Sequence, residues 1–357
     1  MYLYFLHERS AQLMKVYNYI NSINKHKKGG SLAIALNLSK MLSKNTKVSS
    51  YVLKNIDGLK LKITQRNEQS IINHSPFDTS IKNFFYFNFF FKDNFSVIHS
   101  QPNFLLLYAN IDSENNSFWQ KIFKNIKLQL KNFLIYSMII LFSKKVILID
   151  ESHLKYFPRI IQSKLIVIPN IIFAEPKIKK VKDENVTQFL YLGRLESIKR
   201  IDKILEIWKV LSTDENYFLD IVGDGAELEN IKDMVKKNDL HNVRLRPYIS
   251  YINDTLDNSK ILLMASLFEG TPVVIKEGQA RGVIPIVLNT FSAAKNMIHH
   301  GVDGFIIEDK EPEVIAKEIT TILKSSNLIN ISRNCTERIT NHNNEPIIDK
   351  WVKIISG

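Results

Sequence analysis

Cysteine is almost absent from this sequence of 357 residues, which contains only Cys335. No disulfide can therefore form within the chain, and we expect a protein of a reducing compartment, the cytoplasm. The first 13 residues include His7, Glu8 and Arg9 and lack the continuous apolar core of a secretory signal. We interpret residues 1–13 as an extension that precedes the first strand.

Long apolar runs are also lacking. The two strongest, residues 83–92 and 133–142, fall well short of the roughly 20 residues that span a bilayer. We expect residues 133–142, FLIYSMIILF, to be a buried element ahead of a strand. The aromatic run 83–92, NFFYFNFFFK, has lysines at its ends. For this run both a buried element and insertion into a lipid interface stay open.

Metal-ligand patterns are absent from the sequence as well. It has no Asp-x-Asp pair and no set of His and Cys residues at ligand spacing, so we expect neither a metal nor a cofactor. Basic residues are in excess, with a formal net charge of +12, which favours anionic partners. The lysines are spread along the chain rather than clustered with stacking residues, which disfavours a nucleic-acid binder.

What the sequence does contain is an alternation of strand-like and helical segments. Its length makes two domains the default, and 45% hydrophobic residues suffice for ordinary cores. The alternation predicts an α/β fold with parallel sheets. Ligands of such sheets bind at the carboxyl ends of the strands, so the turns that follow predicted strands are where a site is expected.

The most informative segment is SLFEGTPVVIKEGQARG, residues 266–282. Residues 261–265, ILLMA, precede it and predict a buried strand. Thr271 and Pro272 predict a helix start, with Thr as the cap and Pro at the first helical position. Gly282 predicts the end of that helix. Free N–H groups at such a helix start favour the binding of a phosphate.

Two carboxylates, Glu269 and Glu277, flank this predicted phosphate site. They would repel phosphate, and they are suited to accept hydrogen bonds from hydroxyls on either side of it. A phosphate with hydroxyls on both sides describes a nucleotide sugar. Upstream, FLYLGRLESIKRID predicts another strand and turn. There Arg194 and Lys199 are placed to reach one diphosphate, Arg as a fork and Lys as a point charge.

A third segment, FLDIVGDGAELENIK at 218–232, predicts a strand that turns through GDG into a helix. In order and spacing, the three segments resemble the C-terminal half of a retaining glycosyltransferase of the GT-B fold, in the large family four. The resemblance rests on GRL-x-x-x-K, VGDG and the Glu-(seven)-Glu pair, with similar pieces at 14–42, 168–170 and 299–309. It extends over nearly the whole chain, strongly over 160–310 and weakly over 50–150.

The resemblance implies two Rossmann-like parallel-sheet domains that face each other across a cleft. We expect an acceptor-side domain at 14–169, a linker at 170–187 and a nucleotide-sugar-binding domain at 188–330. The tail, 331–357, is expected to hold a helix that crosses back to the first domain. Strands of the first domain are predicted at 15–19, 48–52, 96–99 and 146–149.

The resemblance also implies roles for individual residues. Arg194 and Lys199 would stabilise the departing phosphate, Glu269 would face the donated sugar, and Glu277 would accept hydrogen bonds from the ribose. The expected catalytic residues are Arg194, Lys199, Glu269 and His99. The expected donor-binding residues are Gly29, Gly30, Gly193, Gly270, Thr271, Val273, Glu277 and Tyr248. His99 has a structural alternative, because a lone histidine at a strand end is more often structural.

The activity implied is transfer of a hexose, with retention, from a nucleotide-diphosphate sugar to a glycan or lipid-linked acceptor. UDP is the favoured nucleotide, the sugar stays open, and the expected context is bacterial capsule, lipopolysaccharide or other surface-polysaccharide synthesis. Peripheral contact with an anionic membrane is compatible with such an acceptor. Arg200 and residues 289–292 stand where the family usually has glycines. These departures keep one alternative open, a degenerate protein that binds nucleotide sugar without turnover.

Overall fold

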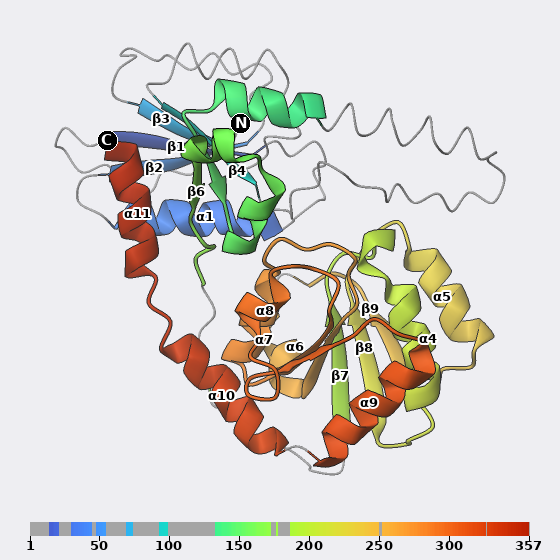
Figure 1. Ribbon diagram of the computed structural model, residues 1–357. Coiled ribbons are helices and arrows are strands. Elements are labelled where there is room, and N and C mark those ends of the chain that lie inside the picture. The colour runs from blue at the N-terminus through green and yellow to red at the C-terminus, as the bar shows by residue number, and fades with distance from the viewer. Residues whose placement is uncertain are drawn as a thin grey trace, which may run out of the picture. The chain divides into compact units, whose positions relative to one another are not determined.

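The computed structural model divides the chain into two compact α/β units (Figure 1). Unit 1 comprises Met1–Ile171 together with Asn344–Gly357, and unit 2 comprises Ile172–Asn343. The residues that the structure describes are 14–20, 30–44, 48–54, 69–73, 93–98, 133–172, 176–177, 186–249, 252–325 and 327–356.

Unit 1 contains a six-stranded parallel sheet in the order β2-β1-β3-β4-β5-β6. Its strands are β1 Met14–Ile20, β2 Val48–Lys54, β3 Gln69–Asn73, β4 Asp93–Ile98, β5 Lys145–Leu148 and β6 Leu165–Val167. Helix α1, Gly30–Leu42, follows β1, and the short 3-10 helices η3, Glu151–Tyr156, and η4, Arg159–Lys164, lie between β5 and β6. The four strands predicted for this region are confirmed. Strand β3, QSIIN, was missed because its apolar pattern is only two residues long.

The FLIYSMIILF segment forms a helix over residues 133–142, and it is less buried than the sequence predicts. Tyr136 and Ile139 are buried on its inner face. Its outer apolar side chains are exposed to 60%, 61% and 70%, in the order Phe133, Leu134 and Leu141. The prediction of a buried element is thus correct for one face of an amphipathic helix and wrong for the other. Within the described part of the chain, no helix has the length and apolarity needed to cross a membrane.

The last helix, α11 (Glu345–Ser356), packs in unit 1. Its buried side chains Ile347, Ile348, Trp351 and Ile355 belong to the same hydrophobic cluster as residues of β1, α1 and β4. Burial of a tryptophan and three isoleucines is the main reason that this short helix stays attached. The preceding helix α10, Leu328–Thr340, belongs to unit 2. The structure therefore divides the tail after Asn343, whereas the sequence reading started it at 331.

Unit 2 has a second six-stranded parallel sheet, in the order β12-β11-β10-β7-β8-β9. Its strands are β7 Thr187–Leu192, β8 Tyr217–Val222, β9 Val243–Arg246, β10 Ile261–Met264, β11 Ile284–Leu288 and β12 Phe305–Ile307. The chain adds β8 and β9 on one side of β7 and then returns to add β10, β11 and β12 on the other. The strand order consequently reverses between β7 and β10, which is where sheets of this kind bind ligands.

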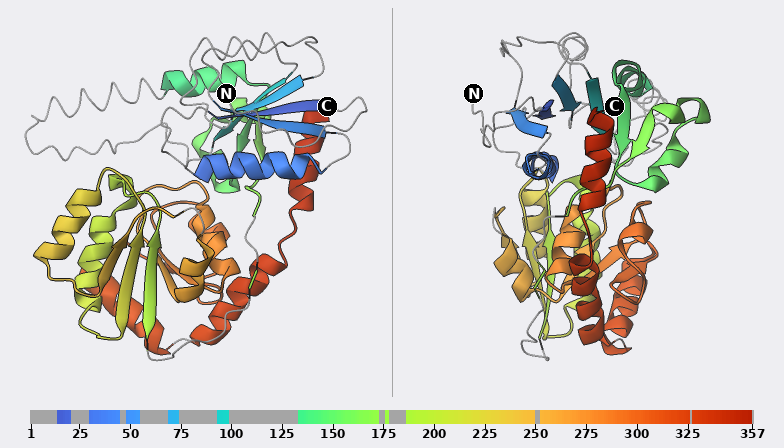
Figure 2. Two further views of the ribbon diagram at one scale, coloured as in Figure 1. Left: turned by 180° about the vertical axis from the view of Figure 1, so that it is seen from behind. Right: turned by 90° about the vertical axis from the view of Figure 1, so that its left-hand side faces the viewer.

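Helices cover both faces of this sheet (Figures 1 and 2). Apolar side chains of α4 (Ile201–Leu211), α5 (Leu228–Lys237) and α9 (Pro312–Ser325) share one buried cluster with one face of β7. Those of α6 (Asn253–Asn258), α7 (Val273–Ala280) and α8 (Ala294–Met297) share another cluster with the opposite face. Because both faces are covered, the central strands are apolar throughout, as FLYL and ILLM show.

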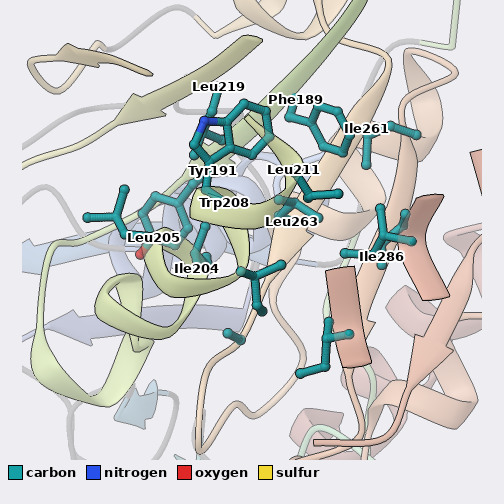
Figure 3. Close-up of a cluster of buried hydrophobic side chains, with 14 of the residues drawn as sticks. Phe189, Tyr191, Ile204, Leu205, Trp208, Leu211, Leu219, Ile261, Leu263 and Ile286 are labelled. Carbon is teal, nitrogen blue, oxygen red and sulfur yellow. The ribbon is translucent and has the colours of Figure 1, made fainter. Parts of the chain in front are cut away.

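The first cluster is built around aromatic side chains at β7 and α4 (Figure 3). Trp208 packs edge-to-face on Phe189 at 5.0 Å between ring centroids, and its indole N–H donates to the Asn242 side chain. Tyr191 lies on the same face of β7 as Phe189, one alternation further toward the carboxyl end of the strand. This packing fixes the β7 strand end from which the turn with Arg194 emerges.

Candidate functional site

The turns after β7 and β10 meet at the point where the strand order of unit 2 reverses. The ammonium of Lys199, which ends the 3-10 helix η5 (Ser197–Lys199), lies 2.6 Å from Glu269 Oε1. The backbone joins the same two turns, since the N–H of Leu267 donates to the carbonyl of Ile198 at 2.9 Å. The side chains of Lys199 and Glu269 are only 16% and 12% exposed. Two of the predicted catalytic residues, 70 positions apart, are therefore in direct contact.

Arg194 lies on the same strand end but points toward solvent. Its guanidinium is 2.6 Å from Glu196 Oε1, and its side chain is 51% exposed. Charged groups of both turns affect the pKa of Tyr191. Burial chiefly raises the pKa of this phenol, with the charge of Glu269 raising it further and that of Arg194 opposing. The structure thus brings Lys199 and Glu269 into contact, while Arg194 pairs with Glu196 in the turn after β7.

The GDG turn after β8 supports the β7 turn through close backbone contact. A Cβ on Gly223 would lie 1.8 Å from the carbonyl oxygen of Gly193, and a Cβ on Gly225 would lie 2.1 Å from that of Leu195. The N–H of Leu195 donates to the carbonyl of Asp224 at 2.8 Å. Glycine is required at both positions because any side chain would separate the two turns. In this structure, the VGDG motif packs against the turn that carries Arg194 and Lys199.

Helix α7 begins at Val273, one residue later than the sequence predicts. Pro272 is the N-cap residue, and the cap has no side-chain hydrogen bond. The assignment of Thr271 as the cap and of Pro272 as the first helical residue is therefore wrong. Pro272 has an extended backbone, with a ψ of 110°, so the first residue in helical geometry is Val273. The first N–H groups of a helix have no partner within the helix, and such a helix start is suited to an anion.

The other end of α7 agrees with the sequence. The helix ends at Ala280, and Gly282 follows with a φ of 67°. The N–H of Val283 donates to the carbonyl of Gly278 at 2.9 Å, closing the hydrogen-bonded loop that a left-handed glycine permits. Gly282 is confirmed as the residue that terminates the helix and turns the chain into β11.

Glu277 lies in the middle of α7 and differs from Glu269 in its surroundings. Its side chain is half-buried, and burial raises the pKa of its carboxyl group. Among the residues that the structure describes, none forms a hydrogen bond or an ion pair with Glu277. A partly buried carboxylate without a partner carries a desolvation cost. Hydroxyl donors of a ligand would relieve this cost.

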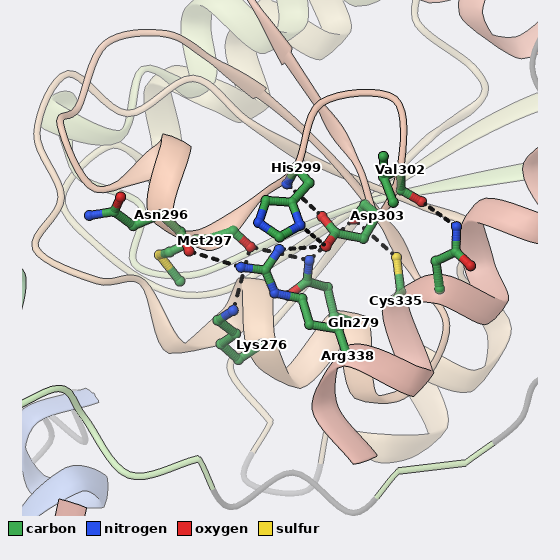
Figure 4. Close-up of polar contacts among 10 residues, drawn as sticks. Lys276, Gln279, Asn296, Met297, His299, Val302, Asp303, Cys335 and Arg338 are labelled. Atoms are coloured by element: carbon green, nitrogen blue, oxygen red, sulfur yellow. Dashed lines mark hydrogen bonds and ion pairs between the residues drawn. The ribbon is translucent and has the colours of Figure 1, made fainter. Parts of the chain in front are cut away.

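The opposite side of α7 is held by a buried polar network that sequence reasoning missed (Figure 4). Asp303, 2% exposed, accepts from Arg338 of α10 at 2.5 Å, and its backbone carbonyl accepts from Gln279 of α7 at 3.2 Å. Lys276 of α7 approaches the carbonyl of Met297 at 3.4 Å. Burial and nearby Arg338 lower the pKa of Lys276 to about 8. The sequence signal was the HHGVDG piece, whose aspartate had been given no role.

Arg200 stands where the family usually has a glycine, and its backbone conformation shows why glycine suits this position. Its φ is 51° and its ψ is 51°, the left-handed region in which glycine is strain-free. A left-handed residue with a side chain costs roughly 1–2 kcal/mol. The guanidinium of Arg200 lies 2.6 Å from Asp309 Oδ2, which offsets part of this cost. The departure therefore changes backbone strain and leaves the Lys199–Glu269 contact in place.

Among the other predicted donor-binding residues, Gly193 and Gly270 lie in the two turns that meet, and Gly270 is buried. Gly30 is the first residue of α1 in unit 1. Tyr248 follows the edge strand β9, two strands away from β7, and is 48% exposed. Gly29 and His99 lie outside the described residues. Within the described ranges, no three His, Cys, Asp or Glu side chains are grouped as they would be around a metal ion.

Comparison with known proteins gives a consistent result. Residues 173–342 match the family described as "Glycosyl transferases group 1". An uncharacterised glycosyltransferase of Haemophilus influenzae is 28% identical over 190 residues, 52% of this chain and 53% of that protein. UDP-Gal:alpha-D-GlcNAc-diphosphoundecaprenol alpha-1,3-galactosyltransferase of Escherichia coli is 28% identical over 198 residues, 50% of each chain. The chain spans about half the length of the curated relatives it matches.

Among solved structures, Anabaena Alr3699/HepE in complex with UDP-glucose aligns with a TM-score of 0.70 at 15% identity, covering 96% of this chain and 99% of that one. The lipopolysaccharide outer core galactosyltransferase WaaB aligns with a TM-score of 0.60 at 14% identity, covering 96% and 99%. At these identities the likeness establishes the fold. Residues 173–342 thus resemble the group 1 glycosyltransferases, and the chain has the GT-B fold of these solved structures.

Proposed function

We propose that this chain transfers a hexose from a UDP-sugar to a glycan or lipid-linked acceptor, with retention, in the synthesis of a bacterial surface polysaccharide. The observation that carries the proposal is the contact of Lys199 with Glu269 at the reversal of strand order. A cation, two carboxylates and a helix start belong to the adjacent turn, loop and helix after β7 and β10. These are the groups that a nucleotide sugar requires.

In the proposed complex, cations contact the diphosphate of the donor and carboxylates accept hydrogen bonds from its hydroxyls. The diphosphate lies at the start of α7, within reach of Lys199 and Arg194. The ribose hydroxyls donate to Glu277, which satisfies its half-buried carboxylate. The ammonium of Lys199 then contacts both the diphosphate and Glu269. The free oxygen of Glu269 accepts hydrogen bonds from hydroxyls of the hexose. The solved relative Alr3699/HepE is described as a complex with UDP-glucose, which supports UDP as the nucleotide.

The proposed reaction breaks the bond between the anomeric carbon and the β-phosphate oxygen and forms a bond from that carbon to the acceptor oxygen. The acceptor's proton passes to the departing phosphate on the same face of the sugar. The products are the glycosylated acceptor and the nucleoside diphosphate. Lys199, Arg194 and the α7 start stabilise the charge that develops on the leaving group, the role of a preorganised electrostatic site. No metal is assigned a step, so EDTA is expected to leave the rate unchanged.

The acceptor is proposed to be lipid-linked and presented at the inner face of the plasma membrane. The name of the Escherichia coli relative specifies a diphosphoundecaprenol acceptor. The outer face of helix 133–142 exposes Phe133, Leu134 and Leu141, a surface suited to an apolar interface. The adjacent Lys144 is exposed and supplies positive charge for anionic lipid. Vesicle flotation with Leu141→Glu tests this part: the variant is expected to bind anionic vesicles less than the wild type does.

Thermal shift with a panel of UDP- and GDP-sugars tests donor binding. A ligand that binds the folded state raises its apparent stability with increasing saturation. We expect one sugar nucleotide to raise the melting temperature of the wild type, and Glu277→Ala to abolish most of that rise. Glu229→Ala is the matched control, because Glu229 is an exposed helical glutamate paired only with Lys232 among the described residues. A full shift in Glu277→Ala would remove Glu277 from the site.

Turnover separates the proposal from its alternative. Purified protein incubated with the donor found in the panel, with and without a lipid-linked acceptor, is assayed for release of the nucleoside diphosphate and for sugar transfer. Transfer supports the enzyme. Binding without release or transfer would instead identify a degenerate nucleotide-sugar-binding protein.

A further inference from the structure

Tyr191 is a buried tyrosine at the β7 strand end. It is 2% exposed, and its hydroxyl donates to the backbone carbonyl of Arg194 at 2.7 Å. The ring lies in the aromatic cluster with Phe189 and Trp208 (Figure 3). The phenol therefore reaches out of the hydrophobic core to the turn that carries the expected phosphate-binding cations.

The hydroxyl occupies the space directly beneath that turn. A Cβ built on Gly193 would lie 3.1 Å from Tyr191 Oη, a tight contact that glycine avoids. On its other side, the turn is held by backbone bonds to β8 and its GDG turn: Gly193 N–H donates to Val222 at 3.1 Å and Leu195 N–H to Asp224 at 2.8 Å. Tyr191 thus adds a side-chain bond at Arg194 to the backbone bonds made by Gly193 and Leu195.

We infer that Tyr191 is a positioning residue for the proposed transfer: its hydroxyl holds the Gly193–Arg194 turn so that Arg194 and Lys199 face the leaving diphosphate. This inference rests on the proposed function. Burial and the charge of Glu269 raise the pKa of the phenol, so the hydroxyl keeps its proton and remains a donor throughout the neutral range. Electrostatic stabilisation depends on preorganised groups, and a loosened turn loses that advantage even though both cations remain.

Replacement of Tyr191 by Phe removes the hydroxyl and keeps the ring in the core. The chain also offers a matched control in Tyr217→Phe. Tyr217 is 8% exposed, belongs to the same cluster and packs against Phe189. It begins β8 opposite Thr187, at the other end of the strands from the turn. Both changes remove a hydroxyl and keep an aromatic ring in the same cluster, so a general effect of altering this cluster is expected in both variants.

The first measurement is hydrogen exchange of the full chain without donor, followed by mass spectrometry. Tyr191→Phe is expected to raise exchange in the peptide 192–200 several-fold, whereas Tyr217→Phe leaves that peptide unchanged. Unchanged exchange in Tyr191→Phe, or an equal rise in both variants, would overturn the inference. Hydrogen exchange does not depend on catalysis. It therefore tests whether the Tyr191 hydroxyl restrains the turn even if the donor has been misassigned.

The second measurement is steady-state transfer with the donor identified by thermal shift. We expect kcat to fall about tenfold in Tyr191→Phe, the effect of losing one hydrogen bond of roughly 1.4 kcal/mol, with a much smaller change in the KM for the donor. Tyr217→Phe is expected to keep the wild-type kcat. An unchanged kcat in Tyr191→Phe would overturn the positioning role. A wild type without transfer activity would contradict the proposed function instead, while the exchange result stands.

Discussion

Two ion pairs of unit 2 have nearly the same length and differ in how their carboxylates are bonded. Lys199 and Glu269 lie 2.6 Å apart at the carboxyl ends of β7 and β10, where each side chain retains some contact with solvent. Arg338 of α10 lies 2.5 Å from Asp303, and Asp303 is 2% exposed. Asp303 also accepts from the backbone N–H of His299 at 2.8 Å.

The two carboxylates differ in whether an oxygen remains free to accept a hydrogen bond from a ligand. Both oxygens of Asp303 are engaged by protein groups, Oδ1 by His299 and Oδ2 by Arg338, so this pair is a structural connection. Glu269 accepts from Lys199 through Oε1 alone among the described residues. A pair with a free oxygen, located where the strand order reverses, is suited to exchange partners with a ligand. The two pairs are thus distinguished by whether a carboxylate oxygen is free and by their position relative to the reversal of strand order. The distance between the charged groups does not distinguish them.

The largest effect is expected from breaking the structural pair. Asp303→Ala leaves Arg338 without its carboxylate in a mostly buried place, a change that costs about 3–5 kcal/mol. Urea unfolding of the full chain should report this loss. A cost below about 1 kcal/mol would show that the Arg338–Asp303 pair does not hold α7 and α10 together, and the comparison would fail.

Breaking the site pair should affect catalysis more than folding. Lys199→Met is expected to lower the rate of sugar transfer about 100-fold, since one preorganised donor contributes on the order of 3 kcal/mol to the barrier. The unfolding free energy should change less than in Asp303→Ala. The double variant Lys199→Met, Glu269→Gln removes both charges and is expected to regain stability without regaining activity. Recovery of activity in the double variant would contradict the proposed role of Lys199.

Glu277 extends the comparison to a carboxylate that lacks a protein partner within the described residues. Burial raises its pKa above 4.5 in the folded state, so ionisation of Glu277 disfavours folding. The wild type consequently loses stability relative to Glu277→Gln as pH rises from below 4.5 through the raised pKa. At pH 7 the Gln variant should be more stable by roughly 1 kcal/mol, a typical single-site effect, while losing the donor-induced thermal shift. Thermal unfolding from pH 4 to 8 measures the difference.

The smallest effect is expected at Arg200, where strain and an ion pair oppose each other. Arg200→Gly relieves the left-handed backbone and loses the contact with Asp309, whereas Arg200→Ala loses the contact and keeps the strain. Gly should therefore exceed Ala in stability by about 1 kcal/mol, with the wild type close to Gly. Equal stability of the two variants in thermal unfolding would contradict the φ of 51°.

Much of the site was predictable because its residues follow strands at fixed short distances. A buried strand followed by GRL-x-x-x-K or by E-G-T-P places polar residues at the carboxyl edge of a parallel sheet, whatever the remaining chain does. The start of α7 was predicted one residue early because proline fixes φ and leaves ψ free, and the ψ of Pro272 is an extended 110°. The exposure of Leu141 was missed because composition shows that a segment is apolar and not which of its faces is covered.

The sequence by itself determined the class of fold, the turns that carry charge and the glycine that ends α7, because these depend on local geometry and the periodicity of apolar residues. Only the tertiary structure decided which charges meet. Lys199 reaches Glu269 across 70 positions, and Asp303 reaches Arg338 across 35. Strand order and helix packing bring together partners so distant along the chain. Local sequence patterns do not predict such contacts.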